Sequence, residues 1–494
     1  MRRAIRGIGR HLLRFLGYGS GGVVLVLLAG FLWLNVSRKP ELRPWHTAVF
    51  REEFTRSDSA RVRDLSDYRK LEDRLFDELK GLLYRNAGRD GQRLNRYSAG
   101  SLADPTGYPE NGNRSYELTA HAPRAGVLMV HGLGDSPYSL RSLAQELHRR
   151  GCWVVGLRLP GHGTAPSALT SVRWEDWAAA VRMAAKHLRQ RIGASTPVYF
   201  VGFSTGAALS VEYALARQEG EDLPKVDGLV LLSPAIGVDP LAWLAVWQAR
   251  MAVLPGLEKL AWFDIYPEYD PYKYVSFAVN SGHQVYTITK IIDERITRLA
   301  ASGPLRGFPR TLVFQSVADA TVSAPAVVTV FLGRLAPEGH EAVGFDINRR
   351  ADVEPLLRPD ARIPAEKLLS GQVLPFDVTL LTNQDERSSA IIALRRPAGG
   401  SEVQREETGL RWPTSVFSLS HIALPVPPDD PIYGAMRPED DSMLYLGRPE
   451  LIGELGLLAV PMESLVRLRF NPFFSYLERR TVQFLRLEEA PRVR

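Results

Sequence analysis

The chain has 494 residues, of which 45% are hydrophobic and 23% charged, so a large core can form and a wholly disordered chain is excluded. The formal net charge of +6 comes from the amino terminus, because residues 1–16 hold five arginines and no acidic residue. The rest of the chain is nearly neutral, and a basic face for a nucleic acid is not predicted. The single cysteine, Cys152, excludes an internal disulfide.

Residues 17–36 contain no charged residue and are rich in Val and Leu. As an α-helix, such a stretch rises about 30 Å, the thickness of the hydrocarbon core of a bilayer. Because the arginines precede it, we expect a basic cytoplasmic segment over 1–16, a transmembrane anchor over 17–36 and the rest of the chain on the opposite side of the membrane. A cleaved signal peptide is the alternative, but the sequence around Asn35 offers no small-residue cleavage site.

Residues 37–114 combine one helical pattern with a loop. Apolar residues recur at spacings of three and four from Leu65 to Leu83, which predicts an amphipathic helix packed on the main domain. Residues 86–114 are rich in Gly, Asn, Arg and Pro and are typical of a loop. We therefore expect an amphipathic helix and a linker before the main domain.

From about residue 115 to the carboxyl terminus, short apolar strands alternate with helical segments. This order is typical of a mainly parallel sheet with helices on both faces, so residues 115–494 are predicted to form one α/β domain. The predicted strands are 126–130, 152–157, 198–201, 228–232, 311–315 and 376–381. The predicted helices are 139–150, 174–191 and 207–217.

The pattern Gly202-Phe-Ser204-Thr-Gly206 directly follows a predicted strand and directly precedes a predicted helix. A sharp turn of this kind raises a serine hydroxyl above the sheet, near the positive end of the helix, and glycines are needed where the backbone comes close to its neighbours. Ser204 is therefore the candidate nucleophile. It needs a neighbouring base, and the base needs a third group to fix its tautomer.

The base and the acid should follow the serine in the chain, each after a later strand. Three histidines follow Ser204, and we select His421, which ends the strand-like stretch 415–420. His340 lies in a polar stretch and is expected to be solvated, and His283 precedes the best candidate acid.

The candidate acid is Asp319, which stands in the loop after the predicted strand 311–315. Asp385, which follows the predicted strand 376–381, is the alternative. Negative charge on a tetrahedral intermediate also needs preset donors. The amide of Thr205 is one candidate, and the amide of Leu133, in the loop after the strand 126–130, is the other. His131 precedes the serine and is expected to shape that loop rather than to act as the base.

Three segments together, Val130-His-Gly-Leu-Gly-Asp135, Leu157-Arg-Leu-Pro-Gly-His-Gly163 and Gly202-Phe-Ser-Thr-Gly206, resemble the lysophospholipase and monoacylglycerol lipase branch of the α/β-hydrolase superfamily. The resemblance covers about 115–330 and 412–490. It implies a mostly parallel eight-stranded sheet, a helical cap after the sixth strand, here about 238–305, and ester hydrolysis through an acyl-enzyme. Related hydrolases cleave amino-terminal proline residues.

The sequence departs from that family in two places. Asp319 and His421 are separated by 101 residues, where a few tens are usual, so about 331–410 is predicted to hold an insertion. The acid loop also lacks a glycine that is often found there, although Val322 keeps the usual hydrophobic position.

We therefore expect a membrane-anchored serine hydrolase that cleaves a carboxylic ester, such as a monoacylglycerol or a lysophospholipid. Its expected partners are a lipid or small ester substrate and the membrane, and no nucleic acid. Neither a metal nor an organic cofactor is expected, because the chain has no H-E-x-x-H, cysteine cluster or G-x-x-x-x-G-K-[ST]. Two alternatives stay open. One is a peptidase or small-ester hydrolase with the same fold, and the other is a catalytically idle hydrolase fold whose insertion serves as a binding surface.

Overall fold

The structure is a computed structural model that describes residues 30, 36–84, 94–237, 251–252, 254–350, 352–353, 356–358, 366, 369, 373–439, 443–448 and 457–488. Apart from Gly30 and Val36, the expected transmembrane segment lies outside these residues. Within the described ranges, no helix has both the length and the apolar character needed to cross a membrane.

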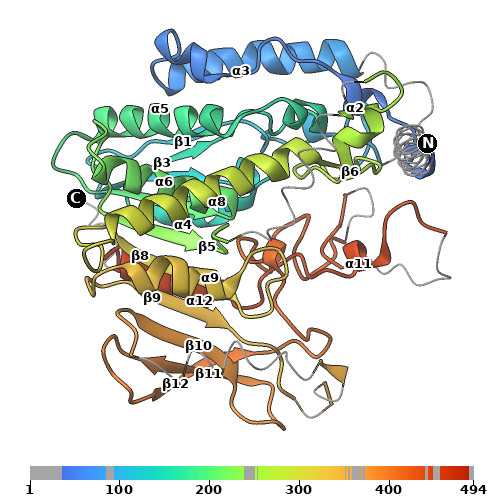
Figure 1. The fold of residues 1–494 in the computed structure, drawn as a ribbon. Helices are drawn as coiled ribbons and strands as arrows, with labels where there is room; N and C mark the ends of the chain where they lie inside the picture. Colours follow the sequence, from blue (N-terminus) through green and yellow to red (C-terminus); the bar gives the residue numbers. More distant parts are fainter. Residues whose placement is uncertain are drawn as a thin grey trace, which may run out of the picture.

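A ten-stranded sheet forms the centre of the molecule, with the strand order β1-β3-β2-β4-β5-β8-β9-β10-β11-β12 (Figure 1). The strands from β3 to β10 in this order run parallel, whereas β1, β11 and β12 pair antiparallel at the two edges. The bounds are β1 Tyr116–Leu118, β2 Ala125–Val130, β3 Cys152–Leu157, β4 Val198–Phe203, β5 Gly228–Leu232, β8 Arg310–Ser316, β9 Glu341–Phe345, β10 Asp377–Asn383, β11 Ala390–Arg396 and β12 Gln404–Arg411. The predicted mostly parallel sheet is thus confirmed.

The expected number of eight strands is wrong, because the region expected as an insertion, about 331–410, extends the sheet. β9 pairs with β8, and β10, β11 and β12 follow outward in turn. The strand expected at 415–420 is also wrong, since this stretch is irregular and contains a turn in which Val416 N–H donates to Pro413 C=O at 3.1 Å. Its apolar residues Val416 and Leu419 are buried in the core instead of alternating along a strand.

Helices cover both faces of the sheet. One face carries α5 (Trp174–Ile192), α6 (Thr205–Gln218) and α8 (Val279–Leu299), and the other carries α4 (Arg141–Arg149) and α12 (Phe474–Phe484). The central strands β2, β4 and β5 are buried along their whole length, as continuous apolar strands between two helical layers should be.

The segment before the sheet packs against the main domain. It contains the short α2 (Pro44–Thr47) and α3 (Leu65–Leu79), which is continued by a π-helical turn over Lys80–Tyr84. The apolar side of α3 is buried, and its Leu65, Tyr68 and Leu71 share one hydrophobic core with α5 and β3. Figure 1 shows α3 lying along the outer side of α5.

The region expected as a cap, about 238–305, is described from residue 254 onward, together with residues 251 and 252. Its residues Trp243 and Trp247 lie outside the described residues. The described part holds a small antiparallel pair, β6 (Trp262–Asp264) and β7 (Phe277–Ala278), followed by α8. Because α8 packs beside α6 in the layer that covers the sheet, the second half of the expected cap belongs to the main fold.

Candidate active site

Ser204 stands at the sharp turn between β4 and α6. Its φ of 52° and ψ of −113° are strained for a residue other than glycine, and such strain persists only where the surrounding structure imposes it. Here the Ser204 N–H donates to Leu232 C=O at 2.9 Å, and the Ser204 C=O accepts the amides of Ala207, Ala208 and Ala235, each at 3.1 Å. The turn is therefore fixed from both the helix and the neighbouring strand.

The two glycines that flank Ser204 are required by close backbone contacts. A Cβ on Gly202 would lie 2.5 Å from the Cα of Ala207, and a Cβ on Gly206 would lie 2.0 Å from the carbonyl oxygen of Val130. Neither contact is possible between real atoms, so the tight packing of α6 against β2 and β4 explains the glycines of the motif.

Asp319 and His421 lie next to each other. The Nδ1 atom of His421 is 2.8 Å from Oδ2 of Asp319, and both side chains are buried. The same carboxylate accepts the amides of Thr321 and Val322 at 2.8 and 3.1 Å and the side-chain amide of Gln315 at 2.8 Å. Burial raises the pKa of Asp319, but the hydrogen bond from His421, the electrostatic effect of His421 and the two backbone amides together lower this pKa more. The carboxyl group of Asp319 is therefore ionised at neutral pH.

The other candidates from the sequence lie elsewhere. Asp385, the alternative acid, is exposed in the loop after β10, where it accepts the amide of Arg387 at 2.8 Å. His283 lies on α8. The expectation of a solvated His340 is wrong, because its ring is 1% exposed and burial lowers its pKa to about 4.

A cavity of about 340 Å³ is lined by four of the five predicted site residues, all except Asp319. Ser204, Thr205, Leu133 and His421 all line it. The rest of its wall is mostly apolar, with a few charged side chains, and includes Phe203, Ala235, Tyr274, Phe277, Val285, Val322, Ile422, Asp135, Lys273 and Arg467. The structure thus places the candidate nucleophile, base and oxyanion donors around one cavity. Lys273 and Arg467 belong to no motif that would have predicted their place in its wall.

The amides of Leu133 and Thr205 have no hydrogen-bond acceptor in the described part of the chain. Thr205 is the first residue of α6, where backbone amides lack partners within the helix and the helix dipole favours negative charge. The loop that holds Leu133 passes beside the serine, because a Cβ on Gly132 would lie 3.1 Å from the Cβ of Ser204. Both amides are thus available to a ligand at Ser204.

His131 fixes the shape of that loop. Its Nδ1 lies 2.8 Å from Gly132 C=O, and its Nε2 accepts the amide of Leu159 at 3.0 Å, so Nδ1 carries the proton. Burial, the neighbouring His162 and the charge of Arg158 lower its pKa well below the usual value, although the Gly132 carbonyl opposes this. His131 is therefore a neutral structural link between two loops of the site.

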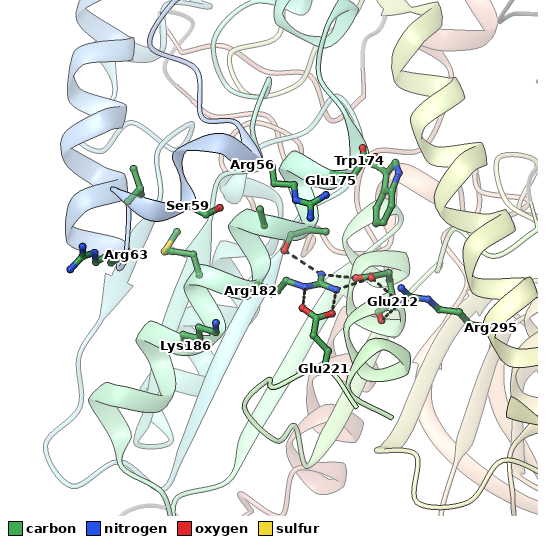
Figure 2. A pocket seen from close by; sticks show the side chains of 14 residues that line it. Arg56, Ser59, Arg63, Trp174, Glu175, Arg182, Lys186, Glu212, Glu221 and Arg295 are labelled. Carbon is green, nitrogen blue, oxygen red and sulfur yellow. Dashed lines mark hydrogen bonds and ion pairs between the residues drawn. The ribbon is translucent and has the colours of Figure 1, made fainter. Parts of the chain in front are cut away.

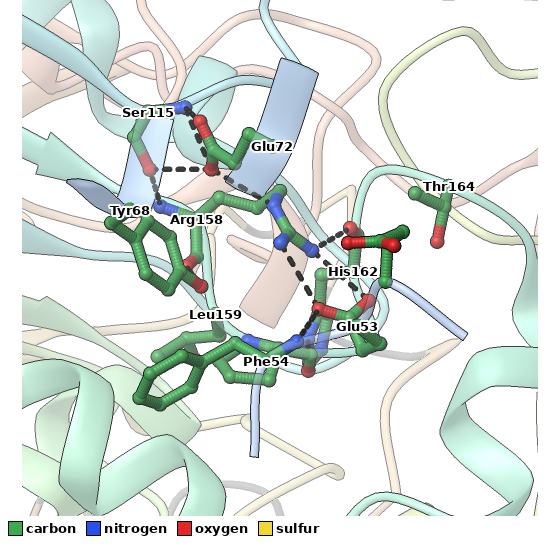
Figure 3. A network of polar contacts seen from close by, with 12 residues as sticks. Glu53, Phe54, Tyr68, Glu72, Ser115, Arg158, Leu159, His162 and Thr164 are labelled. Atoms are coloured by element: carbon green, nitrogen blue, oxygen red, sulfur yellow. Dashed lines mark hydrogen bonds and ion pairs between the residues drawn. The ribbon is translucent and has the colours of Figure 1, made fainter. Parts of the chain in front are cut away.

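A buried ionic network supports the loop after β3, which contains Leu159 (Figure 3). Arg158, which directly precedes Leu159, is fully buried and pairs with Glu72 of α3 at 2.9 Å and with Glu53 at 3.0 Å. Glu72 also accepts the Ser115 hydroxyl at 2.7 Å. Local sequence patterns do not predict these contacts, because the partners are far apart in the chain.

A larger groove of about 620 Å³ lies elsewhere, between α5, α6 and the segment before α3. Figure 2 shows that Arg182, Glu212, Glu221 and Arg295, among its charged side chains, form one ionic network. Arg182 binds Glu212 at 2.9 Å and Glu221 at 2.7 Å, and Arg295 also binds Glu212 at 2.9 Å. This groove holds none of the predicted site residues, so the smaller cavity at Ser204 is the candidate active site.

Comparison with known proteins gives matches to one part of the chain. Residues 121–262 match the family described as serine aminopeptidase, S33. Over 117 residues the chain is 32% identical to a thermostable monoacylglycerol lipase of Bacillus sp. (strain H-257), and this stretch covers 24% of the chain and 43% of that protein. The chain therefore spans less than half the length of this curated relative.

Among solved structures, one of the metagenome-derived lipolytic enzymes LipS and LipT matches with a TM-score of 0.38 and 23% identity, over 48% of this chain and 88% of that one. A monoacylglycerol lipase of Paleococcus ferrophilus matches with a TM-score of 0.35 and 20% identity, over 47% of this chain and 87% of that one. The family match and the sequence similarity, each over part of the chain, support its resemblance to the monoacylglycerol lipase-like branch of the α/β-hydrolases.

Proposed function

We propose that the chain is a serine hydrolase that cleaves carboxylic esters through an acyl-enzyme on Ser204. The observation that carries this proposal is the hydrogen bond between His421 and Asp319 at the wall of the cavity where the strained Ser204 lies. A histidine oriented by an ionised carboxylate is the base that a serine nucleophile needs.

In the proposed reaction, Ser204 Oγ attacks the ester carbonyl carbon and His421 Nε2 accepts the hydroxyl proton. The amides of Leu133 and Thr205 hold the negative charge that develops on the carbonyl oxygen. His421 then donates the proton to the leaving alcohol. In the second half of the reaction, water attacks the acyl carbon while His421 accepts a proton from it, and His421 returns the proton to Ser204 Oγ as the acid leaves. Asp319 keeps the Nδ1 proton of His421 in place throughout.

Lipid monoesters, either monoacylglycerols or lysophospholipids, are the proposed substrates. The mostly apolar wall of the cavity suits an acyl chain, and the curated relative is a monoacylglycerol lipase.

We also propose that residues 17–36 anchor the chain, with residues 1–16 in the cytoplasm. In support, the stretch that follows the proposed anchor contacts the main domain next to β6. There Lys259 Nζ donates to Lys39 C=O at 3.1 Å and to the Glu41 carboxylate at 2.7 Å. An anchor there would hold this side of the domain near the bilayer.

An aminopeptidase is the second candidate, because the matched family is described by that activity. A peptidase of this kind needs a carboxylate to bind the free amino group of its substrate. Among the described residues of the cavity wall, Asp135 is available for this role, but its Oδ2 lies 3.8 Å from Lys273 Nζ. The cavity therefore favours an ester substrate over a cationic peptide terminus.

The test is hydrolysis by the purified full-length chain in neutral detergent of 1-oleoylglycerol, 4-nitrophenyl butyrate and a proline arylamide. We expect cleavage of the esters, loss of this activity in Ser204→Ala, and no change in Ser59→Ala, which alters an exposed serine. Cleavage of the arylamide alone would favour the peptidase. Ester cleavage that persists in Ser204→Ala would contradict the proposed nucleophile.

A further inference from the structure

Arg467 lines the same cavity as Ser204 and His421, although it lies outside the residues that match the family. It belongs to the stretch between His421 and α12 and is exposed to solvent. Its Nη2 lies 3.4 Å from the hydroxyl of Thr321, next to the acid loop. Within the described ranges, no carboxylate lies at ion-pair distance from its guanidinium.

The other cations near the cavity have carboxylate partners. Lys273 lies 3.8 Å from Asp135, and Arg469 pairs with Asp270 at 3.2 Å. Asp319, whose charge acts on Arg467, already accepts hydrogen bonds from His421, Gln315 and two backbone amides. Arg467 therefore presents a positive charge that is not in direct contact with any carboxylate of the described residues.

The electrostatic surroundings of Arg467 agree with this. Burial of part of the side chain lowers its pKa, the charge of Asp319 raises it, and the neighbouring Arg469 lowers it, so that the pKa lies below its usual value. A guanidinium in this setting gains from an incoming anion, because a charge-assisted hydrogen bond replaces incomplete solvation. Its planar fork also matches the two oxygens of a carboxylate or phosphate.

We propose that Arg467 binds an anionic group of the substrate, so that the preferred substrates are fatty monoesters that carry a phosphate or a carboxylate near the ester. This inference rests on the proposed function, because it assigns the alcohol part of the ester to the side of the cavity that Arg467 lines. The acyl chain then takes the apolar wall, which includes Phe203, Phe277 and Val285.

A different role for Arg467 would be to act through the nearby Asp319 by stabilising its charge. That role would change the orientation of His421 and the rate with every ester equally. Binding of a substrate anion changes the rate with charged esters alone. The two roles are therefore separated by substrates that differ only in charge.

The experiment uses two matched pairs of esters with the full-length chain in neutral detergent. The phosphate pair is 1-oleoylglycerol and 1-oleoylglycerol 3-phosphate. The carboxylate pair is the oleoyl ester of 1,2-propanediol at its secondary hydroxyl and the oleoyl ester of lactic acid. Each is tested with the parent, Arg467→Gln, Arg467→Lys and Arg405→Gln, the last of which removes a charge from an exposed position on β12.

We expect Arg467→Gln to lower kcat/KM about tenfold or more for the charged member of at least one pair, with Arg467→Lys in between. The neutral members and the Arg405→Gln control should stay within about twofold. The pair that responds identifies the anion as phosphate or carboxylate. Equal losses for charged and neutral esters, or no loss for either charged ester, would overturn the proposal.

A binding measurement separates this inference from the proposed function. In the Ser204→Ala background, which removes the proposed nucleophile, calorimetry gives the Kd of 1-oleoylglycerol 3-phosphate and of oleoyl lactate with Arg or Gln at position 467. We expect binding of one of them to weaken about tenfold or more with Gln. If the parent cleaves no ester, the proposed function fails, and this measurement alone decides the anion site. Equal affinities with Arg and Gln would refute it.

Discussion

The Nδ1 atom of His421 lies 2.8 Å from Oδ2 of Asp319, although 101 residues separate the two in the chain. The intervening residues include β9 to β12, which lie at the edge of the sheet, and the chain then continues to His421 beside the acid loop. Strands added at an edge extend the sheet without displacing its central strands. The long separation therefore does not prevent the pair from forming.

Replacement of Asp319 by Asn should lower kcat for ester hydrolysis by about 10³- to 10⁴-fold, because the amide can present a donor to Nδ1 and favour the wrong tautomer of His421. Asp385→Asn is the matched control and should stay within about twofold, since Asp385 is exposed. Steady-state kinetics on 4-nitrophenyl butyrate measure both. A large loss with Asp385→Asn and none with Asp319→Asn would reverse the assignment of the acid.

The Gly206→Ala variant should be inactive or poorly folded. Its methyl group would lie 2.0 Å from the carbonyl oxygen of Val130, so either α6 or β2 must shift and carry the oxyanion donors with it. Gly81→Ala, where no heavy atom lies within 4 Å of the added Cβ, is the control and should keep its activity. Circular dichroism with hydrolysis measures folding and function together. A fully active Gly206→Ala enzyme would mean that the turn is not packed as described.

The buried pair of Arg158 and Glu72 should matter more to stability than any exposed pair. In Glu72→Gln, Arg158 keeps Glu53 as an acidic partner but loses Glu72. Loss of one member of a buried ion pair lowers the free energy of unfolding by about 3–5 kcal/mol. Glu52→Gln removes an exposed partner of Arg74 and should cost at most about 1 kcal/mol. Urea unfolding gives both values. Equal costs would show that the network is not desolvated.

Acid should destabilise the protein through His340. Its pKa of about 4 in the folded chain lies below the unfolded value of 6.5, so the unfolded chain binds the proton more readily as the pH falls through that interval. The free energy of unfolding should thus decrease between pH 6.5 and 4. His340→Leu should reduce this decrease by about 2 kcal/mol at pH 4.5.

The control for His340 is His121→Leu, which changes an exposed histidine and should leave the acid-dependent loss of stability as in the parent. Urea titrations at pH 7 and pH 4.5 measure the difference for each variant. A His340→Leu variant that loses as much stability in acid as the parent would show that this imidazole is accessible to protons in the folded state.

The central sheet and the elbow at Ser204 could be predicted because their signals are local. Continuous apolar runs indicate buried parallel strands, and glycines at a fixed spacing indicate a tight turn. Chain order after the serine then selected Asp319 and His421, which the structure places together. Their catalytic roles remain predictions.

Of the strands added at this edge, β10 corresponds to the predicted strand 376–381, whereas β9, β11 and β12 could not be predicted from the same signals. β12, Gln404–Arg411, is mostly exposed and polar on both sides, as edge strands often are because this discourages pairing with other chains. The buried contacts of Arg158 and the burial of His340 were missed because they depend on partners and surroundings remote in sequence. The apolar spacing near 415–420 predicts a strand, but such spacing alone does not distinguish a strand from an irregular buried segment.

Covalent labelling tests the central claim most directly. The full-length chain is treated with a neutral fluorophosphonate, its intact mass is measured, and the modified residue is mapped by peptide sequencing. We predict an adduct on Ser204 that is absent in Ser204→Ala and forms far more slowly in His421→Ala. A folded parent chain that takes no label, or takes it at another residue, would contradict the account.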